Sequence, residues 1–452
     1  MESLIAWFTQ VDRWIWQPLF VILVGTGLYL TYILRGIQFH RLGYALRLAF
    51  TRHDDKAKGD ISHFEALMTA LAATIGIGNI AGIATAVALG GLGSLFWLWV
   101  TALIGMSTKY AEAVLAVRYR IVDDRGEMAG GPMYYIERGL GWKKLAIAFA
   151  FFGAVTAVFT GNVVQSQSIA SAVESYFSIS PWATGAVIAI CTGLVLIGGI
   201  QSIGKVTSYL VPFMALFYIL GSLVILVIRY EALPEAIGLI FDSAFTGQAA
   251  VGGFAGSTIM MAIQMGVARG VFSNESGLGS APIAAAAAKT DLPGRQALIS
   301  MTGAFLSTIV CTFTGLVLAV THVLGGYGLD GKVLNGAPMT IQAFDSVLPY
   351  GGYIVLIGSV LFGYSTIIGW AYYGEKCCEY LLGTASIFLY RCFFTLMAFL
   401  AVSIPLELVW IFADISNAFM ALPNLIALVA LSGVVVYQTR IFLAKVKRES
   451  KS

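Results

Sequence analysis

Charged side chains are scarce in this chain of 452 residues, of which 11% are charged and 58% are hydrophobic. Because a soluble globular domain carries about 25% charged residues, the composition excludes an ordinary soluble protein. Apolar runs of about 18 residues or more recur along the whole sequence, which predicts an all-α integral membrane protein. The runs are continuous rather than alternating, so they do not favour a β-barrel.

Signals of enzymatic chemistry are missing as well. The five cysteines show no metal-ligand spacing, and their odd number within mostly apolar runs indicates reduced packing residues. No Walker motif is present, and the four histidines stand near loops without paired carboxylates at membrane depth. The chain begins acidic and lacks the basic start of a signal peptide. We therefore expect neither an enzyme nor an ATP-driven pump, and nothing points to a nucleic acid or an obligate protein partner.

Eleven transmembrane helices are predicted within a single domain over 1–452. Their lengths suit a hydrocarbon core of about 30 Å, given some tilt. The predicted spans are 15–34, 63–89, 93–117, 144–176, 182–199, 206–228, 251–288, 296–323, 351–374, 386–404 and 408–437.

The lysines and arginines fall unevenly between the two sides of these spans. Of the 27, 22 lie in segments on one side, three (Arg13, Arg229 and Lys332) lie on the other, and two lie within spans. Because positive charge concentrates on the cytoplasmic side, this split predicts an outside amino terminus and a cytoplasmic carboxyl terminus. It also requires an odd number of spans.

Three local patterns accompany the spans. Ser62 and Glu65 have the spacing of a capping box before the second span. The basic, short-apolar segment 36–52 is either a helix lying along the cytoplasmic interface or an ordinary loop helix. The polar excursion 325–350 is long enough to form a lid on the outside.

The second and seventh spans are long and interrupted by glycine. Gly76 and Gly78 break the second, and the run at 266–287 breaks the seventh, with Asn79 and Asn274 lying 195 residues apart. With the first helix set aside, each break falls in the first helix of a five-helix half, which indicates a 5+5 inverted repeat with two discontinuous helices. The resulting division is an extra N-terminal helix and interfacial segment (15–60), two repeats (61–230 and 231–437) and a cytoplasmic tail (438–452).

A helix that breaks inside a membrane needs a compensating partner, because unpaired amides and carbonyls in lipid are costly. Half-helix N-termini suit a carboxylate, and the free carbonyls of half-helix C-termini suit sodium or an ammonium group. A small zwitterionic amino acid together with a cation would satisfy both sets. A lone pair of glycines more often reflects close helix packing, but two matched breaks favour a binding site.

Five motifs carry a resemblance to the alanine/glycine:cation symporter family, and it covers nearly the whole chain. They are GIGNIAGIATA, GGLGSLFWLWVTALIGMSTKYAEA, GGPMYYIERGLG, ARGVFSNESGLGSAPIA and STIIGWAYYGEK. Leu98 stands where the family pattern has methionine, and alanines 284–288 stand where a histidine is frequent. The resemblance implies the leucine-transporter-like fold of the amino acid–polyamine–organocation superfamily, in a bacterial or archaeal cytoplasmic membrane.

The same resemblance implies uptake of alanine or glycine with sodium, or sometimes with protons, by alternating access. The nearest alternatives are another small amino acid, such as serine, and proton coupling. A channel is a remote alternative, because channels want a continuous polar lining and the polar breaks here are isolated.

By motif, the resemblance implies a substrate site at the first break. The amides of Ile77 and Gly78 would bind the carboxylate, and Thr74 would offer a carbonyl to the amine unless its hydroxyl bonds back within its own helix. Asn79 would either bind the substrate or brace the broken turn. Trp370 would form one wall of the pocket and exclude substrates with large side chains. The remaining residues of the expected site are Gln165, Phe272, Ser273 and Asn274.

A sodium site is implied between the first and the eighth helix of the repeat. Hard cations take oxygen ligands, and the matching groups are the carbonyls of Ala72, Ile75 and Phe362 and the hydroxyls of Ser365 and Thr366. Serine and threonine in membranes also merely cap helix carbonyls, so the pattern by itself leaves both readings open.

Charged residues within membrane spans are candidates for functional roles. Lys109 and Glu112 are three apart and are expected to form a structural pair on one helix face. Glu275 is expected to hold Arg269 or the broken loop. Asp414 is either a gate or a buried helix-cap residue.

Overall fold

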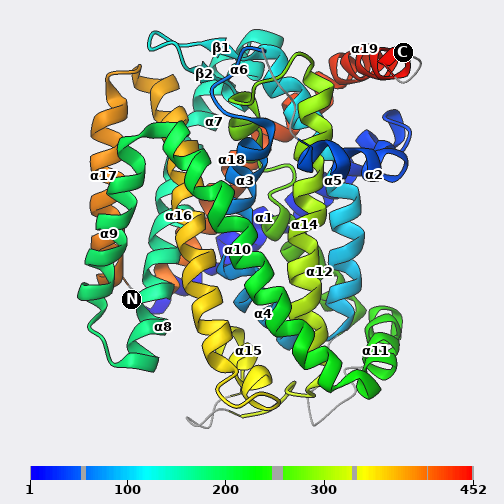
Figure 1. The fold of residues 1–452 in the computed structure, drawn as a ribbon, viewed down its shortest axis with the longest axis vertical. Helices are drawn as coiled ribbons and strands as arrows, with labels where there is room; N and C mark the ends of the chain where they lie inside the picture. Colours follow the sequence, from blue (N-terminus) through cyan, green and yellow to red (C-terminus); the bar gives the residue numbers. More distant parts are fainter. Residues whose placement is uncertain (1, 52–56, 247–257, 328–332, 405, 450–452) are drawn as a thin grey trace.

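The computed structural model describes residues 2–51, 57–246, 258–327, 333–404 and 406–449. The described residues are predominantly helical, and the long helices run side by side through the molecule (Figure 1). These long helices are α1 (Glu2–Ile33), α5 (Gly93–Tyr119), α10 (Gly199–Ile228), α14 (Pro293–Val320), α16 (Gly352–Leu382), α17 (Ser386–Leu400) and α18 (Leu406–Ala430).

The fourth predicted span is continuous but not uniform. It consists of α7 (Lys143–Thr156), a π-helical turn η3 (Ala157–Val163) and α8 (Val164–Phe177). Single π-helical turns inside α-helices are frequent at functional sites, and this one lies beside the pocket described below.

Among the described residues, eight helices are long and apolar enough to cross a membrane, and a ninth span results if one bent pair is counted. The other two of the eleven predicted spans coincide with the shorter apolar helix α9 (Pro181–Ile197) and with the pair α12–α13. Residues 251–257, at the start of the seventh predicted span, lie outside the described residues. The all-helical membrane class is therefore confirmed, whereas the count of eleven and the inverted repeat stay predictions.

The second predicted span is broken as expected. α3 (His63–Thr74) ends just before Gly76, a short 3-10 turn η1 (Ile77–Asn79) follows, and α4 (Ala81–Gly90) continues at an angle of 66° to α3. α3 starts with the predicted capping box: the Ser62 hydroxyl accepts from the Glu65 amide, and the Glu65 carboxylate accepts from the Ser62 amide.

The seventh predicted span is also interrupted, but later than the sequence suggested. α12 (Ile259–Asn274) runs helically through Arg269, Ser273 and Asn274, and the chain unwinds only from Glu275 until α13 (Ala281–Ala286) begins. Gly277 and Gly279 have φ angles of 89° and 83° there, a region that glycine enters without steric cost.

Helices from both halves of the sequence enclose the two breaks. α5 packs against α12 and α14, and α16 packs against α3, α10 and η3. α18 packs against α7, η3 and α1. α9 and α17 lie side by side at one flank (Figure 1). The breaks are therefore surrounded by protein rather than by lipid.

Short elements cover the two ends. The end that holds the carboxyl terminus carries α2 (Ile37–Phe50), the hairpin of β1 (Ile121–Val122) and β2 (Met128–Ala129), α6 (Pro132–Tyr135), the π-helical turn η2 (Ile136–Leu140) and α19 (Ser432–Glu449) (Figure 1). The opposite end carries α11 (Leu233–Thr246), preceded by the turn η4 (Tyr230–Ala232), and α15 (Gly336–Asp345), while η5 (Ala401–Ser403) follows α17. α15 is the helical part of the predicted lid segment 325–350 and packs on α4 and α16.

Polar contacts join the elements at the end of the molecule that holds the carboxyl terminus. Arg120 donates to the carbonyls of Ala286 and Ala288 at 2.8 and 2.7 Å. Lys376, at the end of α16, contacts Asp123 of the hairpin and Glu379 at 3.3 and 2.7 Å. The sequence analysis did not predict this hairpin, whose strands have only two residues each.

Candidate functional site

The first break leaves two backbone amides without a partner. Within the described part of the chain, no hydrogen bond is formed by the N–H groups of Ile77 and Gly78. A Cβ added at Gly78 would meet nothing within 4 Å, so the backbone borders open space here. The partial positive charge of these amides makes the turn a suitable place for a carboxylate.

Asn79 holds this turn in place. Its side-chain oxygen accepts the Gly76 amide at 3.1 Å, its Nδ2 donates to the Ser307 hydroxyl at 3.0 Å, and its carbonyl accepts from Thr314 at 3.0 Å. Of the two roles left open by the sequence, the structure therefore displays the bracing of the turn. Asn79 also lines the adjacent pocket.

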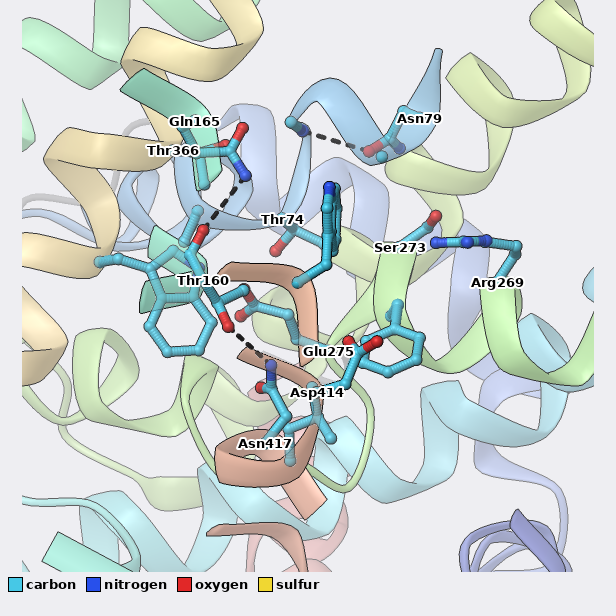
Figure 2. Close-up of a pocket in the computed structure, with 17 residues that line it drawn as sticks. Thr74, Asn79, Thr160, Gln165, Arg269, Ser273, Glu275, Thr366, Asp414 and Asn417 are labelled. Carbon is cyan, nitrogen blue, oxygen red and sulfur yellow. Dashed lines mark hydrogen bonds between the residues drawn. The ribbon is translucent and has the colours of Figure 1, made fainter. Parts of the chain in front are cut away.

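The pocket beside this turn is small and lies between α3, α12, η3, α16 and α18 (Figure 2). Its volume is about 70 Å³. A water-sized group needs about 10–15 Å³ of such a volume, so the pocket has room for roughly five groups of that size. The lining residues are Ala73, Thr74, Gly76, Gly78, Asn79, Thr160, Gln165, Arg269, Phe272, Ser273, Glu275, Leu278, Thr366, Trp370, Trp410, Asp414 and Asn417.

Most of the predicted substrate residues are brought together here. Thr74, Gly78, Asn79, Gln165, Phe272, Ser273 and Trp370 all line the pocket. Ile77, which lies between two lining residues of the turn, and Asn274 do not line it. Asn274 instead accepts a hydrogen bond from Thr308 on α14 at 3.3 Å. The Thr74 hydroxyl bonds back to the carbonyl of Ala70, so it is occupied within its own helix.

Trp370 forms one wall of the pocket. A Cβ placed on Gly161 of η3 would lie 2.2 Å from the Trp370 Cβ, so only glycine admits the indole at this position. Tyr373 packs against the indole edge-on, with ring centroids 5.4 Å apart. The indole is therefore fixed between two helices.

Phe272 forms a second wall and is supported by the extra N-terminal helix. The ring of Trp16 on α1 lies 4.7 Å from the Phe272 ring, measured between centroids, and the Trp16 indole donates to the carbonyl of Asp414. α1 therefore contributes to the outer wall of the pocket without lining it.

Thr160 and Asn417, which the sequence analysis did not single out, form the remaining wall together with the expected Gln165. Asn417 donates to the Thr160 hydroxyl at 2.8 Å and to the Ala413 carbonyl at 2.9 Å, and Gln165 donates to the Thr160 carbonyl at 3.2 Å (Figure 2). A carbonyl can only accept, so both amide groups are fixed with their oxygens turned away. These two oxygens are buried without a partner, which leaves hydrogen-bond acceptors for an ammonium group at the pocket.

The five predicted sodium ligands meet at one point between α3 and α16. The Ser365 hydroxyl lies 3.2 Å from the carbonyl oxygen of Ala72, 3.3 Å from that of Ile75 and 2.9 Å from that of Phe362. The Thr366 hydroxyl lies 3.2 Å from the Ala72 oxygen and 2.9 Å from the Phe362 oxygen. Two hydroxyl protons cannot fully satisfy five such contacts, so the cluster has the excess of oxygen lone pairs that a hard cation requires.

Of the two partners expected for Glu275, Arg269 or the broken loop, the structure shows the loop. Glu275 does not hold Arg269: the charge that acts on Arg269 is Asp414, on the same pocket. Glu275 instead interacts with Lys109 and accepts from the Ser280 hydroxyl of the unwound segment at 2.8 Å. Asp414, for which the sequence left a gate or a buried helix-cap residue open, lines the same pocket as Arg269.

Glu112 of α5 braces the second break. Its Oε1 accepts the amides of Gly277 and Gly279 at 3.1 Å each and the side-chain amide of Asn424 at 2.7 Å. The expectation of a Lys109–Glu112 pair on one helix face is thus incomplete, because Glu112 primarily braces the unwound segment. The two breaks differ in one respect: a side chain of the protein accepts two amides of the second break, whereas the amides of Ile77 and Gly78 at the first have no such acceptor among the described residues.

Comparison with known proteins agrees with this architecture. A model of the sodium:alanine symporter family matches residues 1–452. The chain belongs to this family. The sodium/alanine symporter AgcS of Methanococcus maripaludis is 58% identical over 449 residues, which cover 98% of both chains. The amino-acid carrier protein AlsT of Bacillus subtilis is 34% identical, over 93% of this chain and 88% of that protein.

Among solved structures, MhsT in complex with L-phenylalanine superimposes with a TM-score of 0.61, covering 85% of this chain and 93% of that one, at 15% identity. At that identity the likeness shows the fold alone. This member of the sodium:alanine symporter family is thus a multi-pass membrane transporter with a leucine-transporter-like fold, and not an enzyme.

Proposed function

We propose that this transporter imports small neutral amino acids, alanine and glycine first, together with Na⁺ by alternating access. The observation that carries the proposal is the adjacency of two sites: Thr366 belongs both to the oxygen cluster and to the pocket lining. A cation bound by the cluster would lie next to the substrate, so each would stabilise the binding of the other.

The pocket supports a small substrate. Its volume of about 70 Å³, with room for roughly five water-sized groups, suits alanine or glycine and is too small for leucine. The carboxylate would meet the amides of Ile77 and Gly78, and the ammonium would face Gln165, Asn417 and Glu275. The uneven lysine and arginine distribution supports an outside amino terminus and a cytoplasmic carboxyl terminus.

The division into an N-terminal helix (15–60), two repeats (61–230 and 231–437) and a tail (438–452) belongs to this proposal. The two breaks would then lie at equivalent places in the two repeats, and one set of helices would rock against the other around them. Each Na⁺ that enters down a membrane potential contributes about 2.3 kcal/mol per 100 mV.

Uptake by proteoliposomes tests the proposal. Proteoliposomes that contain the purified protein should accumulate labelled alanine when the Na⁺ concentration is higher outside than inside. This uptake should stop when K⁺ replaces Na⁺. Uptake that responds to a proton gradient but not to Na⁺ would instead establish proton coupling. Serine as the preferred competitor would establish the other candidate substrate, and stepwise single-molecule conductance would point to a channel.

A further inference from the structure

A chain of three hydrogen bonds joins the two broken helices behind the pocket. At the first break, the Gly76 amide donates to the side-chain oxygen of Asn79 at 3.1 Å. The side-chain amide of Asn79 donates to the Ser307 hydroxyl at 3.0 Å, and that hydroxyl donates to the carbonyl of Ser273 at 2.6 Å. Because Ser307 belongs to α14, a third helix carries the connection between the first break and the last turn of α12.

The direction of these bonds is fixed by chemistry. A carbonyl can only accept, so the single proton of the Ser307 hydroxyl goes to Ser273, and the hydroxyl oxygen is left to accept from Asn79. Asn79, Ser273 and Ser307 are each 4% exposed or less. Since a buried polar group that loses its partner is costly, each of the three side chains or carbonyls holds the next in its orientation.

The carbonyl of Ser273 needs this donor because the helix ends. In a continuous α-helix it would accept the amide four residues further on, that of Gly277. α12 ends at Asn274, and the Gly277 amide donates to Glu112 instead. The Ser307 hydroxyl therefore replaces a hydrogen bond that the second break removes, and it does so while it accepts from the first break.

Ser307 stands behind the pocket rather than in it. Asn79 and Ser273 line the pocket (Figure 2), and Ser307 does not. Asn79 braces the turn whose amides would bind the carboxylate, and Ser273 follows Phe272, which forms the second wall. One hydroxyl thus connects the part of the site that would hold the carboxylate to the wall that would face the rest of the substrate.

We propose that Ser307 is a positioning residue for the substrate. Its hydroxyl holds the first break and the end of α12 at a fixed separation, so that one amino acid meets both at once. A preformed arrangement of this kind strengthens binding because the substrate does not have to order the site. The inference rests on the proposed function, since it takes the pocket as the amino-acid site.

Other contacts keep Asn79 attached to α14 when the Ser307 hydroxyl is removed. The Thr314 hydroxyl lies 3.0 Å from the Asn79 carbonyl, and the Cys311 sulfur lies 3.2 Å from the Asn79 side-chain nitrogen. Ser307→Ala should therefore leave the turn on α14 and loosen its connection to Ser273.

The test is a double-mutant cycle on alanine affinity, measured by isothermal titration in Na⁺. Ser307→Ala should weaken alanine binding about 2- to 10-fold, the worth of one neutral hydrogen bond. The double variant Asn79→Ala, Ser307→Ala should bind alanine no more weakly than Asn79→Ala alone, because both changes interrupt the same chain of bonds. Losses that multiply in the double variant would show that the two residues act independently and would overturn the proposal.

Two further variants separate the hydroxyl from the space that it fills. Ser307→Thr keeps the hydroxyl and should bind alanine more tightly than Ser307→Val, which has the shape of threonine without it. Thr302→Val is the matched control on α14, because the buried Thr302 hydroxyl donates to the Ile299 carbonyl of its own helix; its alanine affinity should be unchanged. Equal affinities of Ser307→Thr and Ser307→Val would also reject the positioning role.

Structures of the unaltered protein provide the measurement if the Ser307 variants do not fold. The Ser307 oxygen should stay within hydrogen-bond distance of the Asn79 nitrogen and of the Ser273 oxygen, both with Na⁺ and alanine bound and with neither. Separation of either pair in the alanine-bound structure overturns the proposal. If the unaltered protein binds alanine in Na⁺ and these contacts or couplings are missing, this inference alone fails. If it binds no alanine in Na⁺, the proposed function itself fails.

Discussion

The side-chain oxygen of Asn79 accepts the amide of Gly76 at 3.1 Å, which closes the first break across its own turn. The same side chain reaches Ser307 on α14. These bonds fix the conformation of the turn. The amides of Ile77 and Gly78 therefore remain directed toward open space, because the turn cannot rearrange to bring them to another acceptor. A ligand carboxylate therefore meets donors that are already oriented.

Replacement of Asn79 by alanine should release this turn. The Gly76 amide would lose its buried acceptor, which costs about 1–3 kcal/mol, while the Ser307 hydroxyl would keep its bond to the Ser273 carbonyl. We expect a lower melting temperature and a weaker stabilisation by alanine in thermal unfolding assays. Asn79→Asp, which keeps the acceptor for Gly76, should retain more stability than Asn79→Ala. Equal stability of the wild type and Asn79→Ala would contradict the bracing role.

The indole of Trp370 limits the size of the substrate. Trp370→Ala should enlarge the pocket, so leucine should compete with labelled alanine at least about tenfold better, as expected for several additional methylene groups. Trp99→Ala is the control, because that indole donates to Thr312 away from the pocket. Failure of leucine to compete in Trp370→Ala uptake assays would remove Trp370 from the pocket wall.

The paired hydroxyls on α16 should set the sodium affinity. In the double variant Ser365→Ala, Thr366→Ala, each lost contact with a charged group is worth about 1.5–3 kcal/mol. The half-saturating Na⁺ concentration for alanine uptake should therefore rise more than about tenfold. Ser359→Ala, at another buried position of α16, should leave it unchanged. The same Na⁺ dependence in the double variant and the wild type would reject the sodium site.

Thr160 orients Asn417 by accepting its side-chain amide. Thr160→Val keeps the shape and removes the acceptor, so alanine affinity should fall about 2- to 10-fold, the worth of one neutral hydrogen bond. Thr156→Val, one turn earlier and with a buried hydroxyl that has no partner, should leave affinity unaltered. Isothermal titration in Na⁺ compares the two, and equal affinities would show that Asn417 does not contact the substrate.

Local patterns made part of this site predictable. The capping box of Ser62 and Glu65 and the break at Gly76 depend on residues within a few positions of one another, and their geometry follows from short-range rules. The oxygen cluster joins Ala72 to Ser365, nearly 300 positions away, and only the family resemblance could bring those residues together in advance.

The rest of the site depends on contacts that no local pattern encodes. Glu112 accepts a hydrogen bond from Gly277, which is 165 positions away in the sequence. The spacing of Glu112 and Lys109 predicted a pair between these two residues and did not reveal this contact. Asn417 and Thr160 lie in ordinary apolar runs, and only their polarity at mid-span could have marked them. The sequence analysis treated the two breaks alike, whereas in the structure a carboxylate from α5 accepts two amides of the second.

The central claim is that the free amides of the first break and the oxygens at Ser365 and Thr366 bind an amino acid and Na⁺ together. Equilibrium binding of alanine and of alaninamide to the purified protein, in Na⁺ and in K⁺, tests it most directly. We expect alanine to bind in Na⁺ and to bind at least about tenfold more weakly in K⁺, and alaninamide, which has no carboxylate, to bind in neither. Equal binding of alanine in both salts, or of alaninamide as well as alanine, would contradict the account.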